Sequence, residues 1–206
     1  LGEAFKTKDF YKRENLLSIY FAHHLSRKRS PETKEKIYKI LSLAFKVKDE
    51  DGGANPDTLI DDIERDEILL VETKAVLAEK PTLKTVLGED NRTQMRKYIR
   101  KVLRAGTSDL YPQHLIVSPP KGILFALGDA LLEGREERDV RNRIQKWFER
   151  LVEEVRAELD KENLTIANND ISLVVEFVPQ PVLYAESPDV KPERKNVRGL
   201  PDSIWK

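Results

Sequence analysis

The sequence contains no cysteine and only three histidines among 206 residues. The absence of cysteine excludes disulfide bonds, thiolate zinc sites and a cysteine nucleophile. The histidines, His23, His24 and His114, do not have the HExxH spacing of a zinc metalloprotease. Neither GxGxxG nor GxxxxGK[ST] occurs, so we expect no Rossmann or P-loop site and no nucleotide cofactor.

The sequence also lacks a net charge, because 36 basic residues balance 36 acidic ones. A nucleic-acid partner would therefore need a local basic patch rather than attraction from the whole chain. No apolar run approaches the roughly 18 residues that a membrane-spanning helix needs. We expect a soluble, cytoplasmic (intracellular) protein with no membrane partner. One methionine beside abundant Glu, Lys and Arg is typical of a thermophile protein.

Helical and strand-like segments alternate along one predicted domain, residues 1–178. Apolar spacing predicts helices over 10–29, 31–44, 94–104, 122–132 and 135–159. Strand-like runs cover 45–48, 58–63, 68–76, 114–118 and 171–178. This order predicts an α/β fold with a mixed central β-sheet flanked by helices. Residues 179–206 are rich in proline and charge, so we expect a C-terminal extension or arm without its own core.

A polar cluster is expected where the second strand of a hairpin ends. The runs 58–63 and 68–76 are separated by only four residues, which indicates a tight turn. The apolar stretch stops at Val71, and Glu72 and Lys74 follow. Because residues two apart on a strand share a face, this carboxylate and this ammonium should project together.

The acidic residue that joins them depends on the turn. A two-residue turn at 65–66, with Glu64 opposite Glu67, places Asp57 diagonal to Glu72 and within side-chain reach. A one-residue change in the turn reverses the face and presents Asp62 instead. Asp57 is therefore the first candidate for the second carboxylate, and Asp62 is the alternative.

These residue types are the parts that phosphodiester hydrolysis needs. Two carboxylates with a backbone carbonyl and waters suit Mg²⁺ or Mn²⁺. Such a cation polarises a phosphate and lowers the pKa of a bound water. A lysine close by can orient or deprotonate that water and screen developing charge. The alternative is a surface ion pair without function, which contributes about 0–1 kcal/mol.

The segment Pro56-Asp57 followed by Glu72-Thr73-Lys74 resembles the motif of the PD-(D/E)xK nuclease superfamily. The core order of that superfamily is a helix, a three-stranded meander, a helix and a strand, which is similar to the order predicted over 17–117. The resemblance covers about residues 10–120. It implies a restriction-endonuclease-like core (αβββαβ) and a Mg²⁺-dependent (or Mn²⁺-dependent) deoxyribonuclease, with Asp57, Glu72 and Lys74 in its active site.

Three further candidate site residues follow from the resemblance. RecB-like and archaeal Holliday-junction resolvase-like members often carry a glutamine on the next helix. In the RecB group it belongs to a QxxxY pattern, which Gln94 and Tyr98 match. By spacing, these two residues share one helix face. The family also frequently places an acidic residue on the first helix, which makes Glu14 a third metal ligand. Its alternative is a partly exposed glutamate paired with Arg13 or Lys12.

The helix that carries Gln94 is also very basic. Phosphate contacts require such side chains, and their contribution to affinity falls steeply with salt. The alternative is a solvated helix face, but the position beside the proposed site favours a DNA groove. The predicted DNA-binding residues are Arg92, Arg96, Lys97, Tyr98, Arg100, Lys101 and Arg104.

Three hypotheses follow for function. The first is a metal-dependent DNA endonuclease acting on branched or junction DNA. Such a protein is similar to nucleases of archaeal spindle-shaped viruses, and a viral nuclease would act in the host cytoplasm. The second is a non-catalytic DNA-binding or assembly protein that keeps the nuclease fold. The third is a dimeric structural protein whose charges serve thermal stability. A homodimer is expected, because Trp147 and Phe148 on the long helix could serve an interface as well as a core, and Trp205 in the arm needs a pocket.

Overall fold

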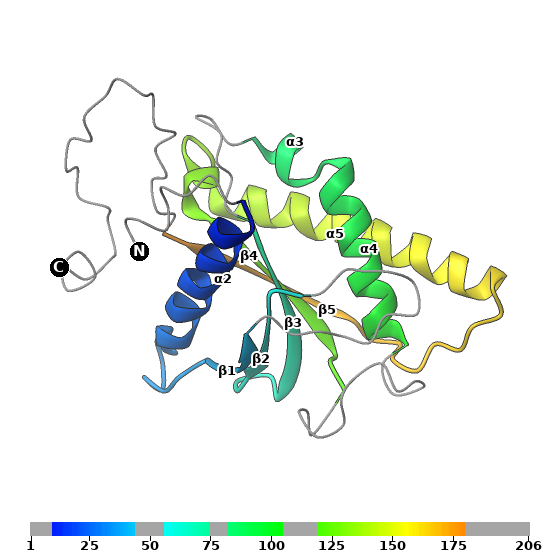
Figure 1. The fold of residues 1–206 in the computed structure, drawn as a ribbon, viewed down its shortest axis with the longest axis horizontal. Helices are drawn as coiled ribbons and strands as arrows, with labels where there is room; N and C mark the ends of the chain where they lie inside the picture. The colour runs from blue at the N-terminus through cyan, green and yellow to red at the C-terminus, as the bar shows by residue number, and fades with distance from the viewer. Residues whose placement is uncertain (1–9, 44–55, 75–81, 105–118, 180–206) are drawn as a thin grey trace.

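The computed structural model describes residues 10–43, 56–74, 82–104 and 119–179. Its elements follow one another as helix, three strands, two helices, strand, short 3-10 turn, helix and strand (Figure 1). Their bounds are α2 Phe10–Arg27, β1 Tyr38–Leu43, β2 Thr58–Asp62, β3 Glu67–Lys74, α3 Leu83–Val86, α4 Glu89–Leu103, β4 Gly122–Gly128, η1 Asp129–Leu132, α5 Glu137–Lys161 and β5 Ser172–Val178.

The described strands form one five-stranded sheet in the order β1-β2-β3-β4-β5. The first three strands are an antiparallel meander, and β4 and β5 continue the sheet in parallel with β3. The expected α/β fold with a mixed sheet flanked by helices is therefore confirmed. Because β3 and β4 run in parallel, their C-terminal ends lie at one edge, where Lys74 pairs with Leu127.

Helices cover both faces of the sheet. Helix α2 lies on one face, while α4 and α5 lie side by side on the other (Figure 1). Successive side chains of a strand point to opposite faces, and β3 follows this rule. Leu69 and Val71 belong to the core under α2, whereas Leu70 belongs to the core under α4 and α5. The alternation continues into the polar end of β3, so Glu72 points towards α4.

The helix predicted over 31–44 is wrong, because residues Tyr38–Leu43 form strand β1. The apolar residues at 37, 38, 40, 41 and 43 fit both the spacing of a helix and that of a strand, because the run is short. Pairing with β2 decides the conformation: Tyr38 lies opposite Asp62 and Ile40 opposite Ile60. A bulge after Ile40 then shifts the register.

The small apolar helix predicted over 122–132 is also wrong over most of its length. Residues Gly122–Gly128 form strand β4, and only Asp129–Leu132 turn as a 3-10 helix. Every residue of β4 is buried, because the strand lies between β3 and β5 with helices on both faces. Such a strand shows no alternation, and its sequence resembles that of a buried helix.

The hairpin of β2 and β3 is confirmed, but its turn is longer than predicted. Asp62 pairs with Glu67, so four residues rather than two form the turn. The register therefore shifts by two residues, which preserves the face of every side chain. Thr58 pairs with Val71, and Asp57, one residue before β2, lies beside Glu72 rather than across from Lys74.

The remaining predicted elements are confirmed where they are described. They are α2, α4, the long helix α5 and the final strand β5. The apolar stripe of α5 packs into the core, and Trp147 stacks on Phe125 with ring centroids 6.3 Å apart. The predicted strands 45–48 and 114–118, and the arm from residue 180 onwards, lie outside the described residues. Among the helices that the structure describes, none has the length and apolar character needed to cross a membrane.

Candidate active site

Glu72 is the buried centre of a polar cluster at the end of β3. Its side chain is 3% exposed and the side chain of Lys74 is 22% exposed. The Nζ atom of Lys74 lies 2.5 Å from Oε1 of Glu72. The phenol of Tyr98, on α4, donates to Oε2 of Glu72 at 2.8 Å. A buried carboxylate needs such partners, because removing it from water without them costs several kcal/mol.

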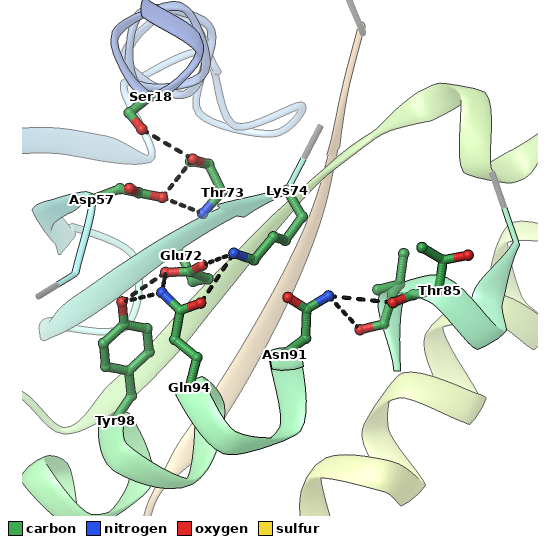
Figure 2. A network of polar contacts seen from close by, with 10 residues as sticks. Ser18, Asp57, Glu72, Thr73, Lys74, Thr85, Asn91, Gln94 and Tyr98 are labelled. Carbon is green, nitrogen blue, oxygen red and sulfur yellow. Dashed lines mark hydrogen bonds and ion pairs between the residues drawn. The ribbon is translucent and has the colours of Figure 1, made fainter. Parts of the chain in front are cut away.

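Gln94 connects the other three residues (Figure 2). Its amide nitrogen donates to Oε2 of Glu72 at 3.1 Å and to the phenol oxygen of Tyr98 at 2.9 Å. Its amide oxygen accepts from Nζ of Lys74 at 3.1 Å. Gln94 and Tyr98 are one helical turn apart and share the face of α4 that covers β3. The predicted convergence of Glu72, Lys74, Gln94 and Tyr98 is therefore seen in the structure.

Burial changes the ionisation of this cluster. It raises the pKa of Glu72 from 4.5 to about 7, with a further rise from the negative charge on Asp57 and an opposing effect of Lys74. Burial, and then the negative charge on Glu72, raise the pKa of the Tyr98 phenol, which keeps it a hydrogen-bond donor. Glu72 is therefore held in a place where its negative charge is costly unless a cation is near.

The raised pKa of Glu72 predicts how stability depends on pH. An acid whose pKa rises on folding from 4.5 to about 7 binds its proton more tightly in the folded state. The free energy of unfolding should therefore fall as pH rises through this window and be constant above it. Glu72→Gln removes the cost of ionisation, so in EDTA the variant should gain about 2–3 kcal/mol over the wild type between pH 5 and pH 8. Urea unfolding at the two pH values measures this gain, and a difference that does not change with pH would contradict it.

Asp57 lies one residue before β2, the strand next to β3, and its side chain reaches the end of β3 that carries Glu72. Its backbone N–H donates to the carbonyl of Val71 at 3.0 Å, and its Oδ2 accepts from the N–H of Thr73 at 2.7 Å. The Thr73 hydroxyl also donates to Oδ2 at 2.5 Å. The carboxylate is close enough to raise the pKa of Glu72. Asp57 and Glu72 therefore lie at the same end of β3, but Asp57 binds Thr73 on the α2 side of the strand, whereas the prediction placed it on the face of Glu72.

The alternative ligand, Asp62, lies at the other end of β2. It is 2% exposed, and its Oδ1 accepts from the N–H of Arg65 at 3.2 Å within the hairpin turn. Burial raises its pKa, while the Arg65 contacts oppose that rise. The structure does not bring Asp62 together with Glu72. Glu14 lies within α2, but its side chain is outside the described part of the chain.

Three of the predicted DNA-binding arginines are paired with glutamates of α5. Arg92 donates to both oxygens of Glu154 at 2.6 and 2.7 Å. Arg96 pairs with Glu158, and Arg100 with Glu162. Both rows have i,i+4 spacing, so arginines and glutamates meet along the helix pair, and Arg96 pairs with both Glu154 and Glu158. We call these six residues the Arg–Glu ladder. It joins α4 to α5.

The ladder points away from the site. Arg92 and Arg96 are two residues before and after Gln94, which puts them on the opposite side of an α-helix. Lys97 and Lys101 are three residues after Gln94 and Tyr98 and share their side. Lys97 is half-buried and Lys101 is buried. Arg104 follows the last residue of α4 as its C-cap.

Two residues of this region were not predicted from the sequence. Thr73 binds Asp57, and Ser18 of α2 lies with its Oγ 3.2 Å from the Thr73 hydroxyl. Thr73 stands between Glu72 and Lys74, so its place in the motif was a signal that it is near the site. Ser18 had no such signal, because it is 55 residues away along the chain.

The residues present fit a divalent cation. Mg²⁺ commonly takes one or two protein carboxylates and keeps several waters, and Asp57 and Glu72 supply two. Among the described residues, no group of three or more acidic or histidine side chains could hold a metal ion. Oδ1 of Asp57 has no hydrogen-bond partner within the described part of the chain. A cation at this position would offset the burial and the repulsion from Asp57 that together raise the pKa of Glu72.

The structure contains a second buried Glu–Lys–Tyr group, which provides a useful contrast. Glu176 of β5 is 7% exposed. It accepts from the Tyr38 phenol at 2.7 Å and pairs with Lys28. This group lies on the α2 face of the sheet. The Glu72 group differs from it by its neighbours Asp57 and Gln94.

Comparisons with known proteins do not extend these observations. No protein-family model, curated protein or solved structure matches the chain. Function is therefore inferred from the residues and from their geometry.

Proposed function

We propose that the protein is a metal-dependent DNA endonuclease that hydrolyses phosphodiester bonds. The observation that carries the proposal is that five side chains lie at one end of β3, four of them in one hydrogen-bonded group and Asp57 joined to β3 through Thr73 (Figure 2). They are Asp57, Glu72, Lys74, Gln94 and Tyr98. Two carboxylates and a lysine at one point are the chemistry that metal-assisted phosphodiester hydrolysis requires.

The order of elements supports a restriction-endonuclease-like core. Helix α2, the meander β1–β2–β3, helix α4 and strand β4 follow one another as α, βββ, α and β. The proposed catalytic residues lie on the third strand and on the next long helix, as the resemblance to the PD-(D/E)xK superfamily implies. Strand β4, rather than the predicted strand 114–118, supplies the final element of this order.

Each residue has a proposed role. Asp57 and Glu72 would hold Mg²⁺ or Mn²⁺, which when bound neutralises phosphate charge and activates a water. Lys74 is a cation at the solvent side of Glu72, from which it can orient that water or contact a phosphate oxygen. Gln94 keeps the ammonium of Lys74 and the carboxylate of Glu72 in place, since it binds both. The Tyr98 phenol donates to Oε2 of Glu72, the same oxygen that Gln94 binds.

DNA is the proposed partner, and its backbone would contact the side of α4 that faces the site. The ladder arginines already bind glutamates, so their charge is largely neutralised. Lys97, three residues after Gln94 on α4, is the cation that we propose contacts a phosphate. This proposal narrows the predicted DNA-binding set to its site-facing members.

The salt dependence of DNA binding tests this narrower set. Lys97→Ala should lower the slope of log K against log salt by about 1, the loss of one phosphate contact. Arg92→Ala is the matched control, because it removes the same charge from the same helix. We expect a much smaller change for it. Fluorescence anisotropy measures the affinity at each salt concentration. Equal decreases of the slope in both variants would show that the Arg–Glu ladder also contacts DNA.

A substrate panel tests the function itself. Linear, nicked, flapped and four-way DNA are incubated with Mg²⁺, with Mn²⁺ and with EDTA. We expect metal-dependent cleavage, strongest on a branched or four-way substrate. Salt-sensitive DNA binding without cleavage of any substrate would instead favour a non-catalytic DNA-binding or assembly protein. Absence of DNA retention even at low salt would oppose both proposals.

A further inference from the structure

Thr73 holds Asp57 through one oxygen only. Both the N–H and the hydroxyl of Thr73 donate to Oδ2, at 2.7 and 2.5 Å. Two donors on one carboxylate oxygen fix the plane of the group. Oδ1 has no protein partner among the described residues. The Asp57 carboxylate is therefore held firmly at one end and open at the other.

The directions of the Thr73 and Ser18 hydroxyl hydrogen bonds connect helix α2 to the Asp57 carboxylate. The single hydroxyl proton of Thr73 goes to Asp57, because an ionised carboxylate can only accept. The Thr73 oxygen therefore accepts from Ser18, whose Oγ lies 3.2 Å away. Ser18 is buried at 8% exposure on the face of α2 that covers β3. A chain of donors thus runs from α2 through Thr73 to Asp57.

We propose that Thr73 and Ser18 are positioning residues that present Oδ1 of Asp57 to a divalent cation. This inference rests on the proposed metal-dependent function and adds residues on the far side of β3 from Gln94. Glu72 is fixed from the α4 side by Tyr98 and Gln94. Asp57 is fixed from the α2 side by Thr73 and Ser18. Helices α2 and α4, on opposite faces of the sheet, therefore each orient one of the two carboxylates.

Hydrogen bonds that fix the Asp57 carboxylate should raise its affinity for a metal ion. Outer hydrogen bonds that orient a ligand typically change metal affinity by about 10- to 100-fold. A carboxylate left free to rotate must lose that freedom when the cation binds. Thr73 removes the freedom before binding, and Ser18 in turn fixes the rotation of the Thr73 hydroxyl.

The test compares Mn²⁺ affinity in the full chain, measured by electron paramagnetic resonance without DNA. Thr73→Val keeps the shape and the backbone N–H but removes the hydroxyl, and should weaken Mn²⁺ binding about tenfold. Thr73→Ser restores the hydroxyl and should bind within about twofold of the wild type. Ser18→Ala should lie between the two. Ser172→Ala is the matched control, because its hydroxyl binds Glu67 at the opposite end of β3 at 2.9 Å.

The outcomes separate this inference from the function on which it rests. Asp57→Asn should bind Mn²⁺ far more weakly than the wild type. If Asp57→Asn weakens binding but Thr73→Val does not, the positioning role is overturned and the metal site stands. Equal losses in Thr73→Val and Thr73→Ser, with unchanged urea unfolding, would assign the effect to packing and also overturn it. A wild-type chain that binds no Mn²⁺ would overturn the proposed function and this inference together.

Discussion

Replacing Glu72 with glutamine should abolish metal-dependent DNA cleavage while leaving DNA binding measurable. The substitution keeps the size of the side chain and a carbonyl oxygen that can accept from Tyr98. It removes the negative charge that would hold a divalent cation beside Asp57. Loss of a group that stabilises charge in the transition state costs about a hundredfold to a thousandfold in rate, and a lost metal ligand should cost at least as much. Cleavage of the preferred panel substrate under single-turnover conditions measures the loss.

The chain offers a matched control for this variant. Glu176→Gln makes the same chemical change in a buried glutamate with a lysine and a tyrosine partner. It should leave cleavage unchanged, because Glu176 binds Lys28 and Tyr38 rather than any residue of the proposed site. Lys74→Ala should also abolish cleavage, but it leaves Glu72 buried without its cation, so its folding must be checked by urea unfolding. Cleavage by both Glu72→Gln and Lys74→Ala at the wild-type rate would contradict the assignment of the active site.

Gly122→Ala should destabilise the protein by about 3 kcal/mol, because β4 meets its neighbours closely at this point. A Cβ atom at position 122 would overlap Oγ of Ser172. It would also lie 2.7 Å from the carbonyl oxygen of Ser172 and 2.9 Å from a methyl carbon of Leu69. The carbonyl belongs to the backbone of β5, so it cannot move away without disturbing the sheet. Urea unfolding at pH 7 measures the change.

This variant also distinguishes the strand from the helix predicted for the same residues. Within a helix, glycine to alanine stabilises by about 1 kcal/mol, so the two conformations predict opposite signs. Ser172→Ala in the same background removes the hydroxyl overlap alone. It should restore only part of the lost stability, because the backbone overlap remains. A more stable Gly122→Ala protein would contradict the position of β4 in the sheet.

The candidate site was predictable because its residues are close in sequence and spaced so that they share one face of a helix or of a strand. Glu72 and Lys74 share a face of β3 by alternation, and Gln94 and Tyr98 share a face of α4 by spacing. The turn length was predicted wrongly, but an error of two residues does not reverse a strand face. Asp57 precedes β2, however, and its carboxylate binds Thr73 at this end of β3 rather than sharing the face of Glu72.

The features that were missed depend on partners far along the chain. The apolar pattern of β1 fits both a helix and a strand, so its pairing with β2 decides the conformation. Strand β4 forms between β3 and β5, whose sequences lie about 50 residues away on either side. The Arg–Glu ladder joins residues 62 positions apart, as in Arg92 and Glu154. The matching i,i+4 spacing of both rows was present in the sequence, and it could have indicated that two helices pair.

The most direct measurement of the proposed metal site is anomalous diffraction from crystals grown or soaked with Mn²⁺. The proposed site predicts a peak next to Oδ1 of Asp57 and a carboxylate oxygen of Glu72, at the Mn²⁺–oxygen distance of about 2.1–2.2 Å (close to that of Mg²⁺). The peak should be absent in Glu72→Gln crystals treated in the same way. A wild-type crystal with no peak between these two carboxylates, or with its strongest peak elsewhere on the chain, would contradict the proposed metal-dependent active site.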